Sequence, residues 1–155
     1  MTEEIAAPVT RYRLTRYHVS LVRDSAEVKE GTRQPRTIAD VALMCSDMRL
    51  LDREQLRTYF LDARGNVIGW EMVSIGTLTA SLAHPREILK GAILSNAAGF
   101  ILAHNHPSGD RLPSDEDRRL TERLKQASEI MGIHLWDHVV ISETGCYSFK
   151  GAGLL

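Results

Sequence analysis

The spacing of apolar residues changes several times along the chain, and the first pattern is strand-like. The stretch RYRLTRYHVSLVRDS, residues 11–25, alternates imperfectly between apolar and polar positions, which predicts a strand. The acidic segment through about Thr10 is expected to be a loose arm, and VKEGTRQP is expected to be a polar linker. We therefore expect residues 1–36 to form an amino-terminal arm and strand, and residues 37–155 to form the main domain.

Helical spacing begins at Ile38 and continues through Met48. Thr37 and Asp40 have the spacing of a capping box, in which each of the two side chains accepts a hydrogen bond from the backbone N–H of the other residue. The pattern predicts a helix from Thr37 to about Arg53.

A β-hairpin is predicted next. Strand-like runs cover Leu56 to Asp62 and Val67 to Ile75, and Arg64-Gly65-Asn66 between them is typical of a turn. The residue before the first run, Glu54, is thus expected at a junction between helix and strand.

The second half of the chain predicts two helices and three strands. Pro85 suits the first turn of a helix that Gly99 is expected to end. The continuous apolar run FILA, residues 100–103, is typical of a strand buried on both faces. An amphipathic helix is expected from Ser114 to Gly132, then a strand over IHLWDHVVIS and a short terminal strand or tail in ETGCYSFKGAGLL. The whole order predicts one α/β domain, with helices flanking a mixed sheet.

Composition limits the partners that the chain can attract. It has 155 residues, 43% of them hydrophobic, and a formal net charge of -1. One ordinary domain fits this length, and no overall positive field would draw it to nucleic acid or acidic lipid. Cys45 and Cys146 are isolated in sequence, and no apolar run approaches membrane-spanning length, so a cytoplasmic protein is expected.

The stretch HNHPSGD follows the buried run directly. Alternate residues of a strand share a face, so His104 and His106 can reach one ion if the strand persists. A catalytic zinc site typically has three protein ligands, and Asp117 is the obvious third candidate because it stands one turn into the helix that follows.

Each of these features also has an ordinary structural explanation. Ser114 and Asp117 form a plain capping box, and a histidine pair at this spacing is more often a surface or hydrogen-bonded pair than a ligand pair. Their combination favours a metal site, because a strand end, a short polar loop and a helix start deliver three donors to one small volume.

The pattern His104-x-His106-Pro107, six residues, Ser114-x-x-Asp117 resembles the JAMM (JAB/MPN-type) metalloprotease signature. The stretches ILAHNHPSGD, HPREI, LDARGNVI, LWDHVVIS and YSFKGAGLL, among others, together resemble the RadC family over residues 40–155. Longer RadC proteins carry an amino-terminal helix-hairpin-helix region, which we do not expect in a chain of this length. The resemblance therefore implies at most weak association with nucleic acid.

The resemblance also implies a JAMM fold, similar to that of cytidine deaminases, with zinc held by His104, His106 and Asp117. Ser114 would help to fix the water and the oxyanion. The family uses an upstream glutamate as general base, which by position is Glu54. Glu71 and Glu87 are the competing candidates: an outward-facing glutamate in a strand and a first-turn helix residue need no catalytic explanation.

The leading hypothesis is a zinc metallohydrolase that cleaves a peptide or isopeptide bond. The alternative is a DNA-repair-associated or mobile-element accessory factor whose metal site is structural or unused. A deaminase needs H-x-E with P-C-x-x-C, which Cys45 and Cys146 cannot supply. An HNH nuclease spreads its three residues along a ββα unit, whereas here they are contiguous. The Asp137-His138 pair is expected to be structural or to support a ligand.

Overall fold

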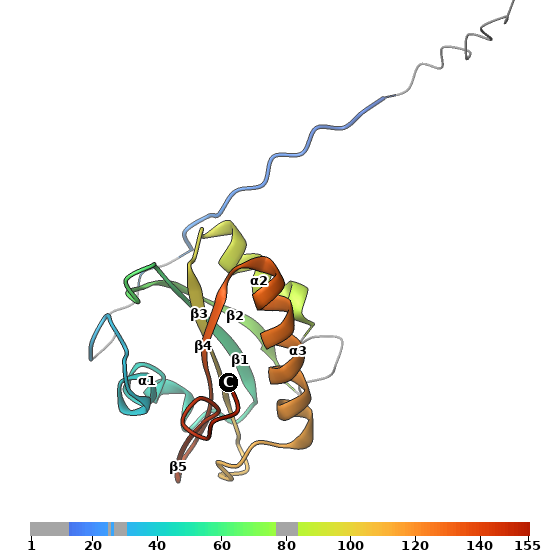
Figure 1. Cartoon of the computed structure of the whole chain (residues 1–155). Coiled ribbons are helices and arrows are strands. Elements are labelled where there is room, and N and C mark those ends of the chain that lie inside the picture. The colour runs from blue at the N-terminus through green and yellow to red at the C-terminus, as the bar shows by residue number, and fades with distance from the viewer. Residues whose placement is uncertain (1–12, 25, 27–30, 77–83) are drawn as a thin grey trace, which may run out of the picture.

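A five-stranded mixed sheet forms the centre of the molecule (Figure 1). The computed structural model describes residues 13–24, 26, 31–76 and 84–155. The strands lie in the order β2-β1-β3-β4-β5; β3 and β4 are parallel, and the other neighbours are antiparallel. Their bounds are β1 Gln55–Leu61, β2 Val67–Ile75, β3 Gly99–Asn105, β4 His134–Ser142 and β5 Gly145–Ser148. The predicted α/β class with a mixed sheet is confirmed.

Helices cover both faces of this sheet (Figure 1). Helix α1, Ile38–Met44, lies on one side, and α2, Pro85–Leu94, lies with α3, Asp115–Met131, on the other. Two apolar clusters result. The cluster under α2 and α3 includes Phe60, Ile88, Phe100, Leu102 and Leu124, and the cluster under α1 includes Val41, Met44, Tyr59, Ile101 and Ala103.

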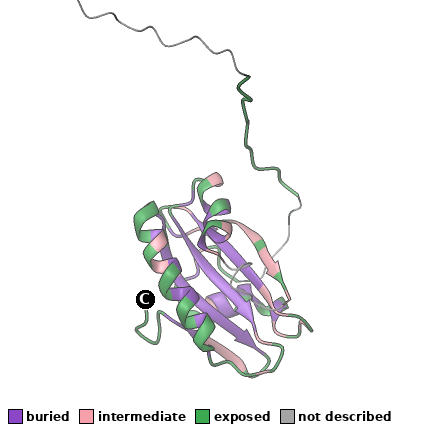
Figure 2. Ribbon diagram, turned by 90° about the vertical axis from the view of Figure 1, so that its right-hand side faces the viewer, coloured by how far each residue is buried: buried purple, intermediate pink, exposed green. Residues whose placement is uncertain are grey.

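Strand β3 contributes to both clusters by simple alternation. Phe100 and Leu102 belong to the cluster under α2 and α3, whereas Ile101 and Ala103 belong to the cluster under α1. Every residue of β3 is buried. Figure 2 shows buried strands behind helices whose outer sides are exposed. The run FILA thus forms the predicted strand buried on both faces, and its alternation decides which way the next side chains point.

The hairpin, the long helix and the last two strands agree with prediction to within one or two residues. Ser114 caps α3, and Gly132 ends it with a φ of 68°, a backbone conformation that glycine adopts without steric cost. Thr37 also forms the expected capping box with Asp40 at the start of α1.

The first helix is shorter than predicted. After Met44 the chain tightens into a 3-10 turn over Ser46–Met48, and residues 49–53 form no helix. The apolar spacing misled the prediction because residues three apart share a side in both kinds of helix. In addition, the Asp47 carboxylate binds the Arg57 guanidinium of β1 at 2.6 Å, a long-range contact that the local pattern does not contain.

The second helix also ends earlier than predicted. Ser95 is its last capping residue, and Asn96 takes a φ of 52°, a conformation that asparagine tolerates better than most residues. Gly99, predicted as the terminator, instead begins β3. A side chain there would collide with the Trp136 ring and the His134 carbonyl of β4, so the glycine serves strand packing.

The strand predicted over residues 11–25 does not form in residues 13–24, the part of it that the structure describes without a break. Those residues are exposed and pair with no strand; Leu14, Tyr17 and Val22, for example, are each more than 80% exposed. A strand needs a neighbour for its hydrogen bonds, which sequence alternation alone cannot supply. The arm predicted through Thr10 lies outside the described residues.

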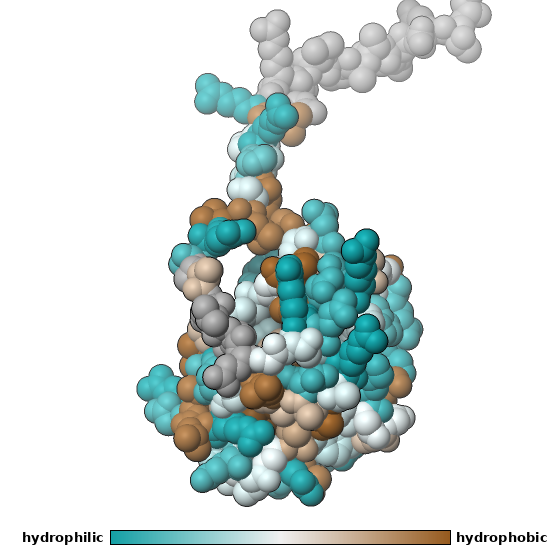
Figure 3. Space-filling view, turned by 90° about the vertical axis from the view of Figure 1, so that its left-hand side faces the viewer, coloured by the Kyte–Doolittle hydropathy of each residue, from teal (hydrophilic) through white to brown (hydrophobic). Residues whose placement is uncertain are grey.

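The surface on the α1 side mixes hydrophilic and hydrophobic side chains (Figure 3). None of the helices in the described part of the chain has the length and apolar character needed to cross a bilayer.

Candidate metal centre

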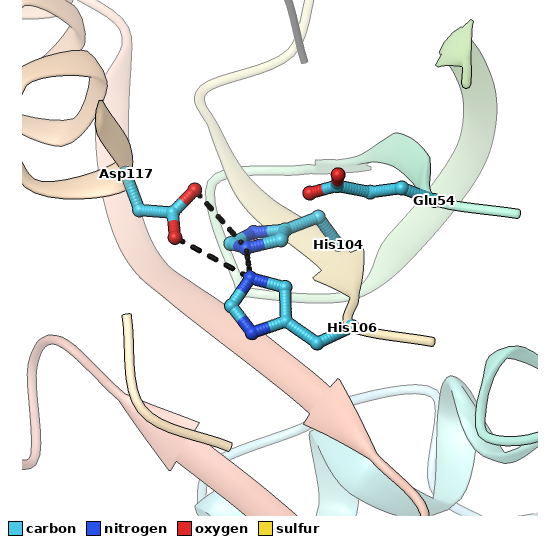
Figure 4. A group of neighbouring side chains, drawn as sticks. All are labelled: Glu54, His104, His106 and Asp117. Carbon is cyan, nitrogen blue, oxygen red and sulfur yellow. Dashed lines mark hydrogen bonds and ion pairs between the residues drawn. The ribbon is translucent and has the colours of Figure 1, made fainter. Parts of the chain in front are cut away.

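The candidate site lies where β3 leaves the sheet beside the start of α3. Because β3 alternates, His104 points to the side that α3 covers, as Phe100 and Leu102 do. His106 lies just beyond the strand, yet its N–H still donates to the Ile141 carbonyl of β4 at 2.8 Å. The strand therefore persists far enough for both imidazoles to face α3 (Figure 4).

Helix α3 supplies a carboxylate through its own capping box. Oδ2 of Asp117 accepts hydrogen bonds from the Ser114 N–H and hydroxyl, each at 2.7 Å, and the Ser114 Oγ accepts from the Asp117 N–H at 3.1 Å. The same carboxylate lies against both histidines. Asp117 is thus both a member of the capping box and a candidate ligand, so the structural and the metal-binding explanations do not exclude each other.

Donor atoms of three residues converge at distances that suit one ion. Nε2 of His104 lies 3.0 Å from Nε2 of His106 and 3.2 Å from Oδ1 of Asp117, and Nε2 of His106 lies 3.4 Å from Oδ2 of Asp117. Donors placed tetrahedrally at 2.0–2.1 Å from zinc are roughly 3.3 Å apart. The three residues present therefore fit a zinc ion both in chemistry and in spacing.

The Asp110 carbonyl orients the second histidine. Nδ1 of His106 lies 2.9 Å from that carbonyl oxygen, which can only accept, so Nδ1 carries the proton. Nε2 of the neutral ring is left with its lone pair toward His104 and Asp117. A backbone carbonyl behind the ring is a common way to orient a metal-binding histidine.

The charges of the cluster support one another. Burial by itself would raise the pKa of Asp117, but the imidazoles of His104 and His106 and the hydroxyl of Ser114, which lie against its carboxylate, hold that pKa far below its usual range. The hydrogen bond to Asp117 raises the pKa of His106, against an opposing effect of desolvation. Asp117 is therefore a carboxylate at every physiological pH, as a ligand must be.

Glu54 joins the cluster from the other side. Its carboxylate and the donor atoms of His104, His106 and Asp117 all lie within 4.8 Å of one another. In Figure 4 the Glu54 carboxylate points toward the imidazoles from the side opposite Asp117. The antiparallel pairing of Leu56 with His104 explains this position, because it sets the start of β1 beside the end of β3.

Asn105, between the two histidines, secures the backbone around Glu54. Its Oδ1 accepts from the Gln55 N–H at 2.7 Å, and its Nδ2 donates to the Arg53 carbonyl at 3.0 Å. The Glu54 carbonyl accepts from the Gly76 N–H at 2.8 Å. Asn105 points away from the histidines, as alternation predicts, but sequence reasoning missed its role because both partners lie about fifty residues away.

The competing glutamates lie elsewhere. The Glu87 carboxylate binds Lys90 at 2.9 Å and Arg86 at 3.3 Å on the exposed side of α2. Burial raises the pKa of Glu71 in β2, and the nearby positive charge of Lys90 opposes that rise. Neither belongs to the group of donors around His104 that the described residues form.

His138 of β4 supports His104 from behind. Its Nε2 lies 2.8 Å from Nδ1 of His104, and its Nδ1 lies 2.6 Å from the Thr121 hydroxyl of α3. The ring is fully buried and stacks on Phe149 with the planes 6° apart. Burial lowers the pKa of His138 well below its usual value, so the ring is neutral. Sequence reasoning considered such a support but could not name its target.

Asp137, the neighbour of His138, has a structural role. Its carboxylate accepts from the Ser148 hydroxyl at 2.6 Å and from the Lys150 N–H at 3.0 Å, which joins β4 to the turn after β5.

An open cleft of about 410 Å³ gives access to the cluster. It is lined by Glu54, His106, Pro107, Ser108, Asp110, Leu112, Pro113 and Ser114. The carboxylate of Glu54 and the hydroxyl of Ser114 thus flank the same open space.

Comparison with known proteins agrees with this geometry. The family model described as the RadC-like JAB domain matches residues 32–154. The UPF0758 protein of Thermotoga maritima is 50% identical over 111 residues, which are 72% of this chain and 50% of that protein. That of Moorella thermoacetica is 48% identical over 123 residues, 79% of this chain and 53% of that protein. The chain thus spans about half the length of the curated relatives it matches.

Proposed function

Because the chain belongs to the RadC-like JAB domain family, we propose that it is a zinc-dependent metallohydrolase that cleaves a peptide or isopeptide bond. The observation that carries the proposal is the convergence of Glu54, His104, His106 and Asp117 within 4.8 Å, beside an open cleft. The family and the cluster together fit a metallohydrolase; the metal, the bond cleaved and the roles of the residues are the proposal.

His104, His106 and Asp117 would hold the ion as two neutral imidazoles and one carboxylate, a ligand set that zinc accepts. A bound zinc ion would polarise the carbonyl group and lower the pKa of water to about 7. The Ser114 hydroxyl and N–H keep Asp117 oriented while it binds.

Glu54 would act as general base and acid. From its side of the cluster it can accept a proton from the attacking water and return that proton to the leaving amine. Ser114 faces the same cleft, and its hydroxyl can donate to the developing oxyanion once it turns from Asp117. Glu54 therefore moves the proton, and Ser114 stabilises the charge.

The test is hydrolysis of internally quenched peptides, including lysine-linked isopeptides, by zinc-loaded protein. Glu54→Gln should retain zinc and lose activity by roughly 10²-fold or more, because it removes the general base but no ligand. Glu71→Gln and Glu87→Gln are matched controls, since they lie outside the cluster, and should retain most activity. Full activity in Glu54→Gln would refute the assignment of the base.

The partner that we propose is a peptide or isopeptide substrate with an extended segment that fits the cleft. The acidic groups Glu54 and Asp110 line this cleft, and no lysine or arginine is among the described residues that line it. A neutral or cationic leaving group is therefore favoured over an acidic one.

A further inference from the structure

A buried chain of hydrogen bonds leads from the back of His104 into the packing between α3 and β4. Nδ1 of His104 lies 2.8 Å from Nε2 of His138. Nδ1 of His138 lies 2.6 Å from the Thr121 Oγ, which in turn lies 2.6 Å from the backbone carbonyl oxygen of Asp117. The three side chains are at most 3% exposed.

The contact between Thr121 and the Asp117 carbonyl determines which atom donates in each of these hydrogen bonds. A carbonyl oxygen cannot donate, and two oxygens 2.6 Å apart without a proton between them would repel, so Thr121 donates to Asp117. The single hydroxyl proton of Thr121 is then committed. Nδ1 of His138 must donate to Thr121, which leaves Nε2 of the neutral His138 ring as an acceptor.

His104 completes the chain. Since Nε2 of His138 accepts, Nδ1 of His104 must carry its proton, and Nε2 of His104 is left with a lone pair. That atom is the one that lies 3.0 Å from His106 and 3.2 Å from Asp117. The packing of α3 on β4 thus selects the tautomer of His104 that a metal ion requires.

We propose that Thr121 and His138 are positioning residues, which hold His104 as the Nδ1–H tautomer with the Nε2 lone pair directed into the metal centre. The role in zinc binding rests on the proposed function, but the tautomers of His104 and His138 are properties of the protein without any metal ion. Stacking of His138 on Phe149 keeps the ring plane fixed, so the hydrogen bonds determine only which ring nitrogen carries the proton.

Thr121 also links the helical turn that holds Asp117 to the tautomer of His104. Thr121 lies one helical turn after Asp117 and donates its hydroxyl proton to that residue's carbonyl, so one turn of α3 positions both the Asp117 carboxylate and the tautomer of His104. Loss of the hydroxyl would leave Nδ1 of His138 without its acceptor. The alternative His138 tautomer would then place a proton on Nε2 of His104, where the metal should bind.

The first test measures tautomers by ¹⁵N NMR of the histidine rings in metal-free protein at mildly alkaline pH. We expect Nδ1–H for both His138 and His104 in the wild type and in Thr121→Ser, which keeps the hydroxyl. Thr121→Val should move the His138 proton to Nε2. An Nε2–H tautomer of His138 in the wild type would overturn the proposal.

The second test measures zinc affinity by competition with a chelator. Thr121→Val should bind zinc roughly 10- to 100-fold more weakly, the usual scale for loss of a hydrogen-bond partner behind a ligand, and Thr121→Ser should restore affinity. Ser128→Ala is the matched control, because it removes another buried hydroxyl of α3, one that donates to the Lys125 carbonyl at 2.9 Å. It should leave zinc affinity unchanged, whatever it does to stability.

The two tests separate this proposal from the proposed function. If the wild type binds zinc and Thr121→Val binds it equally well, the positioning role is wrong while the metal centre stands. If the wild type binds no zinc, the proposed function fails, and the NMR result alone then decides whether the hydrogen-bond chain has the stated direction.

Discussion

Asn105 holds Glu54 by the backbone on both sides, through hydrogen bonds to the Gln55 N–H and the Arg53 carbonyl. Asn105→Ala should lower the free energy of unfolding by about 2 kcal/mol, because buried polar groups lose their partner. Zinc affinity should persist while hydrolysis falls, since Glu54 is no longer held. Urea unfolding, zinc titration and the hydrolysis assay measure the three effects.

Asn66→Ala is a suitable control for that experiment. It removes an asparagine side chain that binds Asp62 at 2.7 Å in the hairpin turn, away from the cluster. It should lower stability without changing hydrolysis. A loss of zinc in Asn105→Ala as complete as in His104→Ala would mean that Asn105 supports the ligands rather than the base.

Ser114 should matter for stability and activity but not for metal retention. Ser114→Ala removes the hydroxyl that caps α3, which typically costs about 1 kcal/mol, and leaves the Asp117 carboxylate with the backbone N–H of residue 114. Thermal unfolding and metal analysis test this. If Ser114→Ala loses zinc as fully as Asp117→Ala, the division of roles in the loop is incorrect.

The neutral, buried His138 should make the metal-free protein sensitive to acid. Because burial lowers the pKa of His138 in the folded state, the imidazole binds a proton below pH about 6.5 in the unfolded chain but stays neutral in the folded chain. Stability from this group is therefore present above pH about 6.5 and is lost as the pH falls, by up to about 1.4 kcal/mol per pH unit.

His138→Gln isolates this contribution. Urea unfolding of both proteins at several pH values between 7 and 5 should give a smaller acid-induced loss of stability for the variant. Equal slopes for the two proteins would show that His138 is not the group responsible. His106 has the opposite trend, because its raised pKa favours the folded state at lower pH. Since both proteins contain His106, the difference between them removes this trend.

Binding to duplex DNA should be weak and fall with rising salt, as expected for nonspecific contact by a chain of net charge -1. Fluorescence anisotropy with labelled duplexes at two salt concentrations measures this. A sequence-specific complex that survives physiological salt would favour the accessory-factor hypothesis over the hydrolase.

The sequence predicted those elements whose signals are local. The hairpin turn, the strand FILA and both ends of α3 depend on neighbouring residues, and each was confirmed. The end of α1 and the fate of residues 11–25 depend on distant partners. Asp47 pairs with Arg57 of β1, and no strand accepts residues 13–24, so local periodicity gave the wrong answer at both places.

The candidate site divides in the same way. His104, His106 and Asp117 were identified by spacing on adjacent elements, and the structure brings them together. Glu54 was assigned by resemblance to a family, and the register of β1 with β3 explains its place. The contacts of Asn105 and the hydrogen bond between His138 and His104 arise only from the pairing of strands far apart in sequence, which one sequence does not reveal.

His104, His106 and Asp117 are expected to hold one zinc ion beside Glu54. Anomalous diffraction from crystals of zinc-loaded protein, recorded on both sides of the zinc absorption edge, would locate this ion. We expect one peak within about 2.0–2.2 Å of both Nε2 atoms and one Asp117 oxygen, with the Glu54 carboxylate beyond bonding distance. A zinc-loaded crystal with no peak at this cluster, or with Asp117 turned away from the ion, would show that these three residues do not form a zinc site.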